Sequence, residues 1–265
     1  MKIVVCVKYV PDAQSDRHFG PDLTTERADV DGLLSELDEY AVEEALVVAD
    51  ALAATGERPE VVVLTVGPPE AADAIKKSLQ MGVDSGVHVS DPAIHGSDAP
   101  ATSRIVAAAV AAQSPDLVIT GMSSTDGGMG VVPAMIAQRL GMPQLTYAAE
   151  LSVDAAADTA RIRRDGDTSV ETVEASLPAI VSVTDQINEP RYPSFKGIMS
   201  AKKKPVATLT LGDLGIDTAD VGIDAAWTRT LAAEARPAKA AGTVITDDGT
   251  GGAQLVDYLV THKLV

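Results

Sequence analysis

The sequence predicts an α/β fold in which helices cover a doubly wound, mainly parallel sheet. Apolar runs alternate with stretches of helical periodicity along residues 1–145, which indicates a repeated strand–helix unit. The runs are continuously apolar, as expected for strands that are buried on both faces of a parallel sheet. With 265 residues, the chain is long enough for one large domain or two modest ones.

The expected helices have recognisable starts and ends. Ser35 can cap the acid-rich helix that follows it, and Gly56 ends that helix. Pro68 and Gly82 bracket the next helix in the same way. In chain order we expect a strand at 2–10, a helix at 35–56, a strand at 59–67, a helix at 68–82, a strand at 86–90, a helix at 97–113, a strand at 115–121 and a helix at 130–141. This order is typical of a Rossmann-like nucleotide-binding domain.

The pattern changes after residue 145. Alternating apolarity and the Asp165–Gly166 turn signal predict an antiparallel hairpin over 145–177. The apolar run at 178–185 predicts a strand that returns to the main sheet, so we place the α/β nucleotide-binding domain at 1–185. Residues 211–265 are expected to form a C-terminal extension, with a short last helix near 252–263 and the character of an arm that reaches another chain.

The stretch "NEPRYPSFKGIMSAKKKP" (188–205) is unusual in so acidic a chain. It is apolar at its tip and ends in three consecutive lysines, and neither a core strand nor a helix explains it easily. We interpret residues 186–210 as a partner-recognition loop with a basic segment.

Composition excludes several function classes. The formal charge of −17 argues against nucleic-acid binding, because phosphate contact needs clustered Lys and Arg. Cys6 is the single cysteine, and the four histidines share no metal-ligand spacing, so we expect neither a disulfide framework nor a metal site. No apolar run approaches the roughly 20 residues that span a bilayer. We expect a soluble protein of a reducing compartment, the cytoplasm.

The strongest candidate site follows the strand at 115–121, in "TGMSSTDGGMGVVP" (120–133). Glycines there let backbone amides approach a phosphate, and the helix that starts near Val131 adds the positive end of its dipole. Asp126 is suited to a ribose hydroxyl or to a helix cap. The spacing is not GxGxxG and no GK[ST] follows, so a nucleotide held without hydrolysis fits better than a triphosphate. A plain strand-to-helix turn is the competing interpretation.

Groups for catalysis are sparse in this chain. Cys6 lies inside a predicted strand, where a buried inert thiol is expected. Lys8 leaves that strand and faces either a ligand phosphate or solvent. Glu43 and Glu44 are neighbours on a helix and point in different directions, so they form no catalytic pair. We expect no bond-making catalysis from this chain alone.

The sequence resembles the β subunit of electron transfer flavoprotein, and its alanine-rich composition is typical of the bacterial type. The resemblance rests on "KIVVCVKYVPD", "DEYAVEEAL", "TVGP", "MGVDSGVHV", "DGGMG" and "NEPRYPSFKGIMSAKKKP", in that order, and it spans nearly the whole chain. It implies a heterodimer with an α subunit, FAD held mainly by α, and a structural AMP in β. It further implies that electrons pass from acyl-CoA and related flavin dehydrogenases to a membrane quinone oxidoreductase, in fatty acid oxidation.

The resemblance also implies the residues of the nucleotide pocket. Ser35 stands where the family has asparagine, "SSTD" replaces the family's "QAID", and Ala13 replaces an aromatic residue that faces the flavin in some members. The implied pocket comprises Cys6, Ser35, Leu37, Asp38, Val66, Gly121, Ser123, Asp126, Gly127, Gly128, Gly130, Val131 and Val132.

The quoted stretch at 188–205 corresponds to the family's recognition loop. Phe195 occupies the position of the apolar side chain, commonly leucine, that fills a pocket on the partner dehydrogenase, and the three lysines are suited to steering. The implied docking surface comprises Tyr192, Phe195, Ile198 and Met199.

Other functions are also compatible with these residues. One is a bifurcating flavoprotein subunit, with a second FAD in place of AMP and electron input from NADH. Another is a stand-alone adenine-nucleotide-binding stress or sensor domain, which would have no use for residues 186–265. An ATP-hydrolysing enzyme is a weaker option, because the Walker lysine is lacking.

Overall fold

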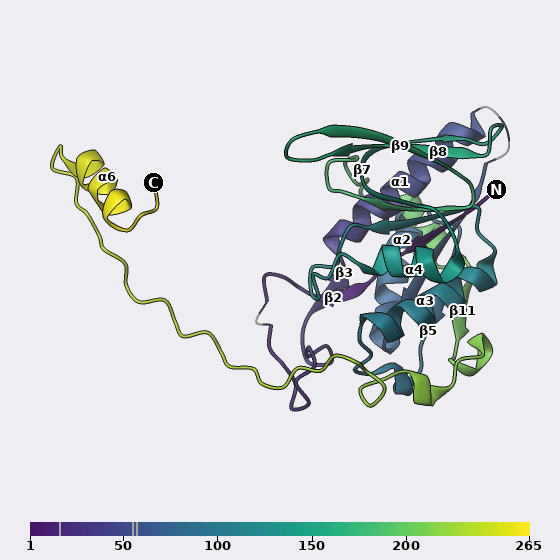
Figure 1. The fold of residues 1–265 in the computed structure, drawn as a ribbon. Coiled ribbons are helices and arrows are strands. Elements are labelled where there is room, and N and C mark those ends of the chain that lie inside the picture. Colours follow the sequence, from purple (N-terminus) through teal and green to yellow (C-terminus); the bar gives the residue numbers. More distant parts are fainter. Residues whose placement is uncertain (16, 55, 57) are drawn as a thin grey trace. The chain divides into compact units, whose positions relative to one another are not determined.

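A nine-stranded sheet forms the centre of residues 1–231 (Figure 1). The structure is a computed structural model and describes every residue except 16, 55 and 57. The strand order is β11-β5-β4-β1-β6-β10-β7-β8-β9. The strands are β1 (Lys2–Cys6), β4 (Glu60–Val66), β5 (Ser85–Val89), β6 (Leu117–Gly121), β7 (Gln144–Asp154), β8 (Thr159–Asp165), β9 (Val170–Ser176), β10 (Ala179–Val183) and β11 (Val206–Leu209).

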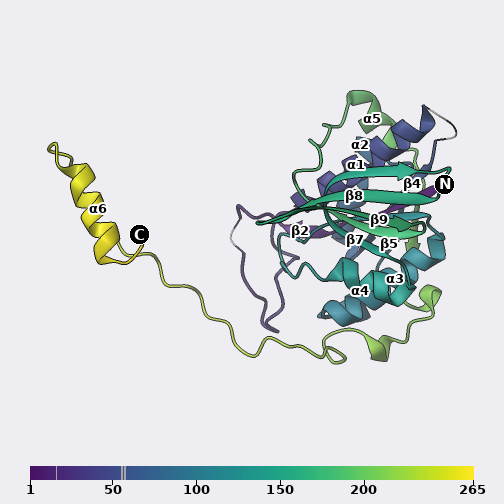
Figure 2. The same cartoon turned by 45° about the horizontal axis from the view of Figure 1, so that its top comes forward.

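Helices cover both faces of this sheet, as Figure 2 shows. One face packs against α1 (Glu36–Ala53) and α2 (Ala72–Met81), and the other against α3 (Ala99–Gln113) and α4 (Val132–Leu140). Successive residues of β1 serve opposite cores, with Val5 on the α1 side and Val4 on the α3 side. Both are fully buried, which explains the continuously apolar strands. The doubly wound α/β prediction is confirmed.

The predicted hairpin and the return strand are also present. β7 pairs antiparallel with β8, and β8 with β9, with the Asp165–Gly166 turn at the β8 end. The chain then re-enters the sheet as β10, which pairs in parallel with both β6 and β7. The return strand therefore joins the hairpin to the remainder of the sheet.

The predicted strand at 2–10 is wrong in its extent. β1 ends at Cys6, and Tyr9–Pro11 (β2) instead pairs antiparallel with Gly32–Leu34 (β3) in a separate small sheet. The break has a local cause, because the Lys8 amide donates to the Asp38 carboxylate at 2.8 Å instead of to a neighbouring strand. The sequence does not predict β3, which is too short to show periodicity.

A helix lies where the sequence did not favour one. Phe195–Ala201 forms α5, whose first turn is capped by the Ser194 hydroxyl, which accepts from the Gly197 amide at 3.0 Å. β11 follows and pairs in parallel with β5 at one edge of the sheet. Residues beyond it contribute Leu211, Ile216 and Val221 to the core, so the first unit continues to residue 231.

Residues 232–265 form a second unit. It contains α6 (Gly251–Thr261), close to the predicted last helix, and none of the α6 residues is buried. Contact of this segment with another chain stays a prediction. Among the described residues, no helix combines the length and apolarity needed to cross a bilayer.

Candidate nucleotide site and docking surface

Asp38 links the start of α1 to the carboxyl edge of the sheet. Its buried carboxylate accepts the Lys8 amide at 2.8 Å and is also hydrogen-bonded by the Gly121 amide. Burial raises the pKa of Asp38 to about 7, although these two amides and the Lys8 cation act in the opposite direction. A Cβ on Gly121 would lie 2.5 Å from Asp38 Oδ1, so only glycine fits there.

Two other predicted residues lie beside this carboxylate. Cys6 is partly buried, and burial, followed by the charge of Asp38, raises the pKa of its thiol to about 12. Ser35 is fully buried and donates its amide to Lys8 O at 2.9 Å, while its Oγ has no hydrogen-bond partner among the described residues. Leu37 is half-buried in the same turn.

The glycine-rich turn after β6 has the backbone that its residues predict. Gly128 and Gly130 adopt φ of 61° and 66°, in the left-handed region that favours glycine. A Cβ on Gly128 would meet nothing within 4 Å, so the backbone of the turn is open to approach there. Val131 precedes α4, which begins at Val132, and Ser123 is half-buried in the turn.

Asp126 pairs with two cations beside this turn. Lys8 Nζ lies 2.9 Å from its carboxylate, and Arg27 Nη2 forms a second ion pair with it. Burial alone would raise the pKa of Asp126, but Lys8 and Arg27 hold it below its usual range. Asp126 Oδ1 also accepts the Gly127 amide at 2.6 Å, so the carboxylate fixes the turn to both cations.

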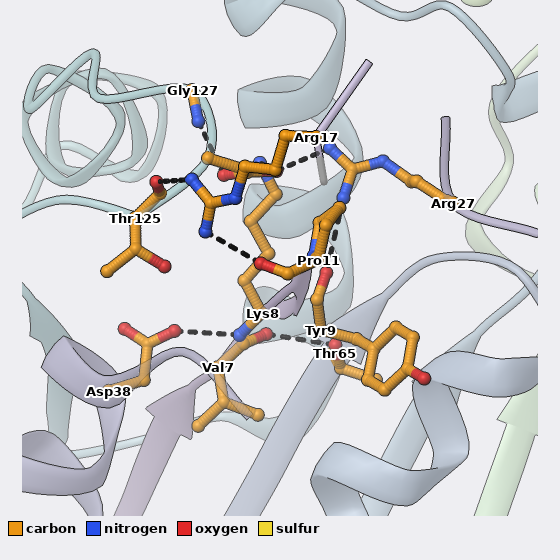
Figure 3. Close-up of polar contacts among 11 residues, drawn as sticks. Val7, Lys8, Tyr9, Pro11, Arg17, Arg27, Asp38, Thr65, Thr125 and Gly127 are labelled. Atoms are coloured by element: carbon orange, nitrogen blue, oxygen red, sulfur yellow. Dashed lines mark hydrogen bonds and ion pairs between the residues drawn. The ribbon is translucent and has the colours of Figure 1, made fainter. Parts of the chain in front are cut away.

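Sequence reasoning missed Arg17 and Arg27. Figure 3 shows both reaching the carboxyl edge from the part of the chain between β2 and β3. Arg17 donates to Thr125 O at 2.6 Å and to Pro11 O at 2.7 Å, which joins the β2 end to the glycine-rich turn. The available signal was the presence of two arginines in an acidic chain, close behind a strand end.

The predicted site residues do not all surround one space. A cavity of about 1000 Å³ opens over the ends of β1, β4 and β5, and among the predicted residues Val66 lines it. The glycine-rich turn lies outside its lining, on the β6 side of β1. Lys8 lines the cavity and also contacts Asp126, so it connects the two parts. In the described part of the chain, no group of three or more His, Cys, Asp or Glu side chains could hold a metal ion.

The residues present fit a ligand that carries a phosphate. Buried Thr125 Oγ1, like the Ser35 hydroxyl, has no hydrogen-bond partner in the described structure and can accept one from a ligand. Open glycine backbone and the cations of Lys8 and Arg27 lie at the same edge of the sheet.

The predicted docking residues lie together on and before α5. Phe195 is 81% exposed and Tyr192 is 91% exposed, while Ile198 and Met199 are less so. Large apolar side chains with this exposure are typical of a binding surface when they are contiguous. The lysines differ from one another, because Lys204 donates to Leu79 O at 3.0 Å and is partly buried, whereas Lys202 and Lys203 are exposed.

Comparison with known proteins gives one consistent result. Residues 22–214 match the family described as electron transfer flavoprotein domain. The β subunits of electron transfer flavoprotein from Mycobacterium leprae and Mycobacterium tuberculosis are 48% and 47% identical over 265 residues, which is 99% of both chains in each case. The caffeyl-CoA reductase–Etf complex subunit CarD of Acetobacterium woodii is 34% identical over 93% of this chain and 92% of its own. The chain therefore belongs to the electron transfer flavoprotein family, among its β subunits.

Proposed function

We propose that this chain pairs with an α subunit to form an FAD-containing electron carrier. The exposed Phe195 on its capped helix is the observation that carries the proposal, because an apolar side chain presented this way suits transient docking. In the heterodimer, the α subunit provides most of the FAD-binding site, and the bound FAD supplies reversible redox chemistry. This chain performs no bond-making catalysis of its own. The carrier works in the cytoplasm.

The electron donors would be acyl-CoA dehydrogenases and related flavin dehydrogenases, and the acceptor a membrane quinone oxidoreductase. Support comes from family membership and from the position of the docking residues within the matched region 22–214. The same match covers part of the segment for which a stand-alone stress or sensor domain has no use, which argues against that alternative.

We propose that AMP is the structural nucleotide of this chain. Lys8 and Arg27 would hold its phosphate beside the open turn at Gly128, and Ser35 and Thr125 offer hydroxyls that have no partner in the described structure. The absence of a GK[ST] motif agrees with a nucleotide that is retained and not hydrolysed.

A second candidate is the bifurcating type, with a further FAD in this chain and electron input from NADH. The cavity of about 1000 Å³ favours it, because its volume is at the upper end of the range for ligand sites. The family also contains a relative named for a caffeyl-CoA reductase complex.

Native mass spectrometry of the complex purified with its α subunit tests both possibilities. We expect one copy of each subunit, one FAD and one AMP. Two FAD and no AMP would replace the first candidate by the second. A homodimer of this chain without any flavin-bearing partner would contradict the proposed function. Stopped-flow reduction of the FAD by an acyl-CoA dehydrogenase and its substrate then tests the electron path.

A further inference from the structure

Two buried carboxylates on α1 have partners in residues 188–205, the docking segment. Glu43 is almost fully buried and accepts from Arg191 through Nε at 2.7 Å, through Nη2 at 2.9 Å and through the backbone amide at 3.1 Å. Glu44, also buried, accepts from Asn188 Nδ2 at 3.0 Å, and the same amide group donates to Tyr40 O at 3.1 Å. Residues 188–191 thus cross α1 and engage both neighbouring carboxylates.

The far end of the segment is fastened to α2. Gly197 lies against the end of that helix so closely that a Cβ would be 2.4 Å from Gln80 O. Lys204 donates to Leu79 O at 3.0 Å, and Ala201 between them is buried. The exposed apolar residues therefore stand on a short arch whose two ends are held by different helices.

These carboxylates are costly to bury. Taking a charge out of water is unfavourable unless it is paired and fully hydrogen-bonded, and well-packed apolar residues often stabilise a fold equally well. Burial raises the pKa of Glu44, although the Asn188 hydrogen bond opposes this shift. The Arg191 guanidinium donates to both carboxylate oxygens of Glu43, so the pair fixes the orientation of the Arg191 side chain as well as its distance from α1. Buried carboxylates with these partners are better suited to orient residues 188–191 than to add to the overall stability of the fold.

We infer that Glu43 and Glu44 are positioning residues for the docking surface, which order the arch through Arg191 and Asn188 before a partner dehydrogenase arrives. The inference rests on the proposed docking function. A surface that is already ordered loses less conformational entropy on binding, and its affinity for the partner is therefore higher. Loss of this order should therefore raise the KM for the dehydrogenase and leave the rate at saturation unchanged.

The test compares variants of the FAD-loaded heterodimer with an acyl-CoA dehydrogenase as the varied substrate. Glu43→Gln is expected to raise KM by about 5- to 20-fold, as the release of a few side chains implies, with kcat within about twofold. Hydrogen exchange of the backbone amides at 189–199 should become faster. Glu174→Gln is the matched control, because Glu174 also binds an arginine, Arg161, through Nε and Nη2, but on the exposed hairpin. The control should leave KM and exchange at 189–199 unchanged.

Phe195→Ala separates this inference from the function on which it rests. If Phe195→Ala raises KM and Glu43→Gln does not, docking stands and the positioning role is overturned. If neither variant changes KM, the docking function itself fails. The double variant should resemble Phe195→Ala alone, because the carboxylate acts through the arch, and multiplied effects would overturn the inference.

Arg191→Lys provides a second route if Glu43→Gln yields no heterodimer. Lysine keeps the charge and loses the two-pronged geometry, so a smaller rise in KM is expected with kcat unchanged. An unchanged KM in this variant would count against the positioning role.

Discussion

Lys8 and Asp126 are 118 residues apart in the chain, yet Lys8 Nζ lies 2.9 Å from the Asp126 carboxylate. Arg27 binds the same carboxylate from a third segment. The glycine-rich turn, the end of β1 and the segment 12–31 are thereby joined at one buried charge. The proposed phosphate site depends on this junction, because the cations and the turn amides share Asp126.

Asp126→Asn is expected to destabilise the protein by about 2–3 kcal/mol, because it leaves two cations facing each other without their anion. The effect should depend on pH with a defined sign. The pKa of Asp126 is held low in the folded state, so its stabilisation is complete above about pH 4 and is lost as the pH falls through the folded value. Urea unfolding near neutral pH and in acid measures both effects, and equal midpoints for variant and parent at neutral pH would contradict the assignment.

Asp38 should show the opposite pH dependence. Its pKa is raised by burial to about 7, so the folded state binds more protons than the unfolded state between about pH 4 and that value. Its contribution therefore makes stability fall as the pH rises through this window. Asp38→Asn should flatten that part of the stability curve, as measured by the unfolding midpoint at several pH values, and an unchanged slope would argue against a protonated Asp38.

Gly121 and Gly128 are glycines for different reasons, so their alanine variants should differ. Gly121→Ala places a methyl group against Asp38 and should cost about 1–3 kcal/mol, as overpacking does. The methyl group of Gly128→Ala would enter open space, so only the positive φ should lower the stability, by about 1–2 kcal/mol. Thermal unfolding measures the stability of the two variants, and the AMP that remains after gel filtration measures their binding of the nucleotide. A larger loss of AMP from Gly128→Ala than from Gly121→Ala would show that the ligand depends more on the open turn than on the buried junction.

Phe195→Ala should slow reduction of the heterodimer by an acyl-CoA dehydrogenase without changing its FAD content. Burial of a phenylalanine contributes about 1.5–3 kcal/mol, which corresponds to a loss of roughly 10- to 150-fold in apparent affinity. Val170→Ala is the control, since Val170 is an exposed apolar residue on β9, away from the docking segment. Stopped-flow reduction rates at several dehydrogenase concentrations decide the matter, and parental rates for Phe195→Ala would remove the docking assignment.

The sequence predicts the sheet well because strands that are buried on both faces appear as runs of consecutive apolar residues. β1, β4 and β6 consist mainly of consecutive apolar residues, and Asp165–Gly166 marks the hairpin turn. These elements are specified by residues that are close in sequence, so local patterns suffice.

The elements that were missed depend on contacts between distant residues. α5 is held where Gly197 meets the backbone of Gln80, and no periodicity in a seven-residue helix reveals that contact. Arg27 acquires its role only when Asp126 lies opposite, and Glu43 acquires its role only when Arg191 crosses α1. In both cases the charge was visible in the sequence and its partner was not.

The position of β10 constrains how the molecule is made. β7 meets the other strands of the sheet through β10, so the antiparallel ribbon of β7, β8 and β9 has no strand of the main sheet to pair with until residues 179–183 have been synthesised. Until then β6 presents a bare edge on a ribosome-bound chain. A nascent polypeptide halted before residue 179 would therefore be prone to pair with its neighbours, and productive maturation waits for the last third of translation.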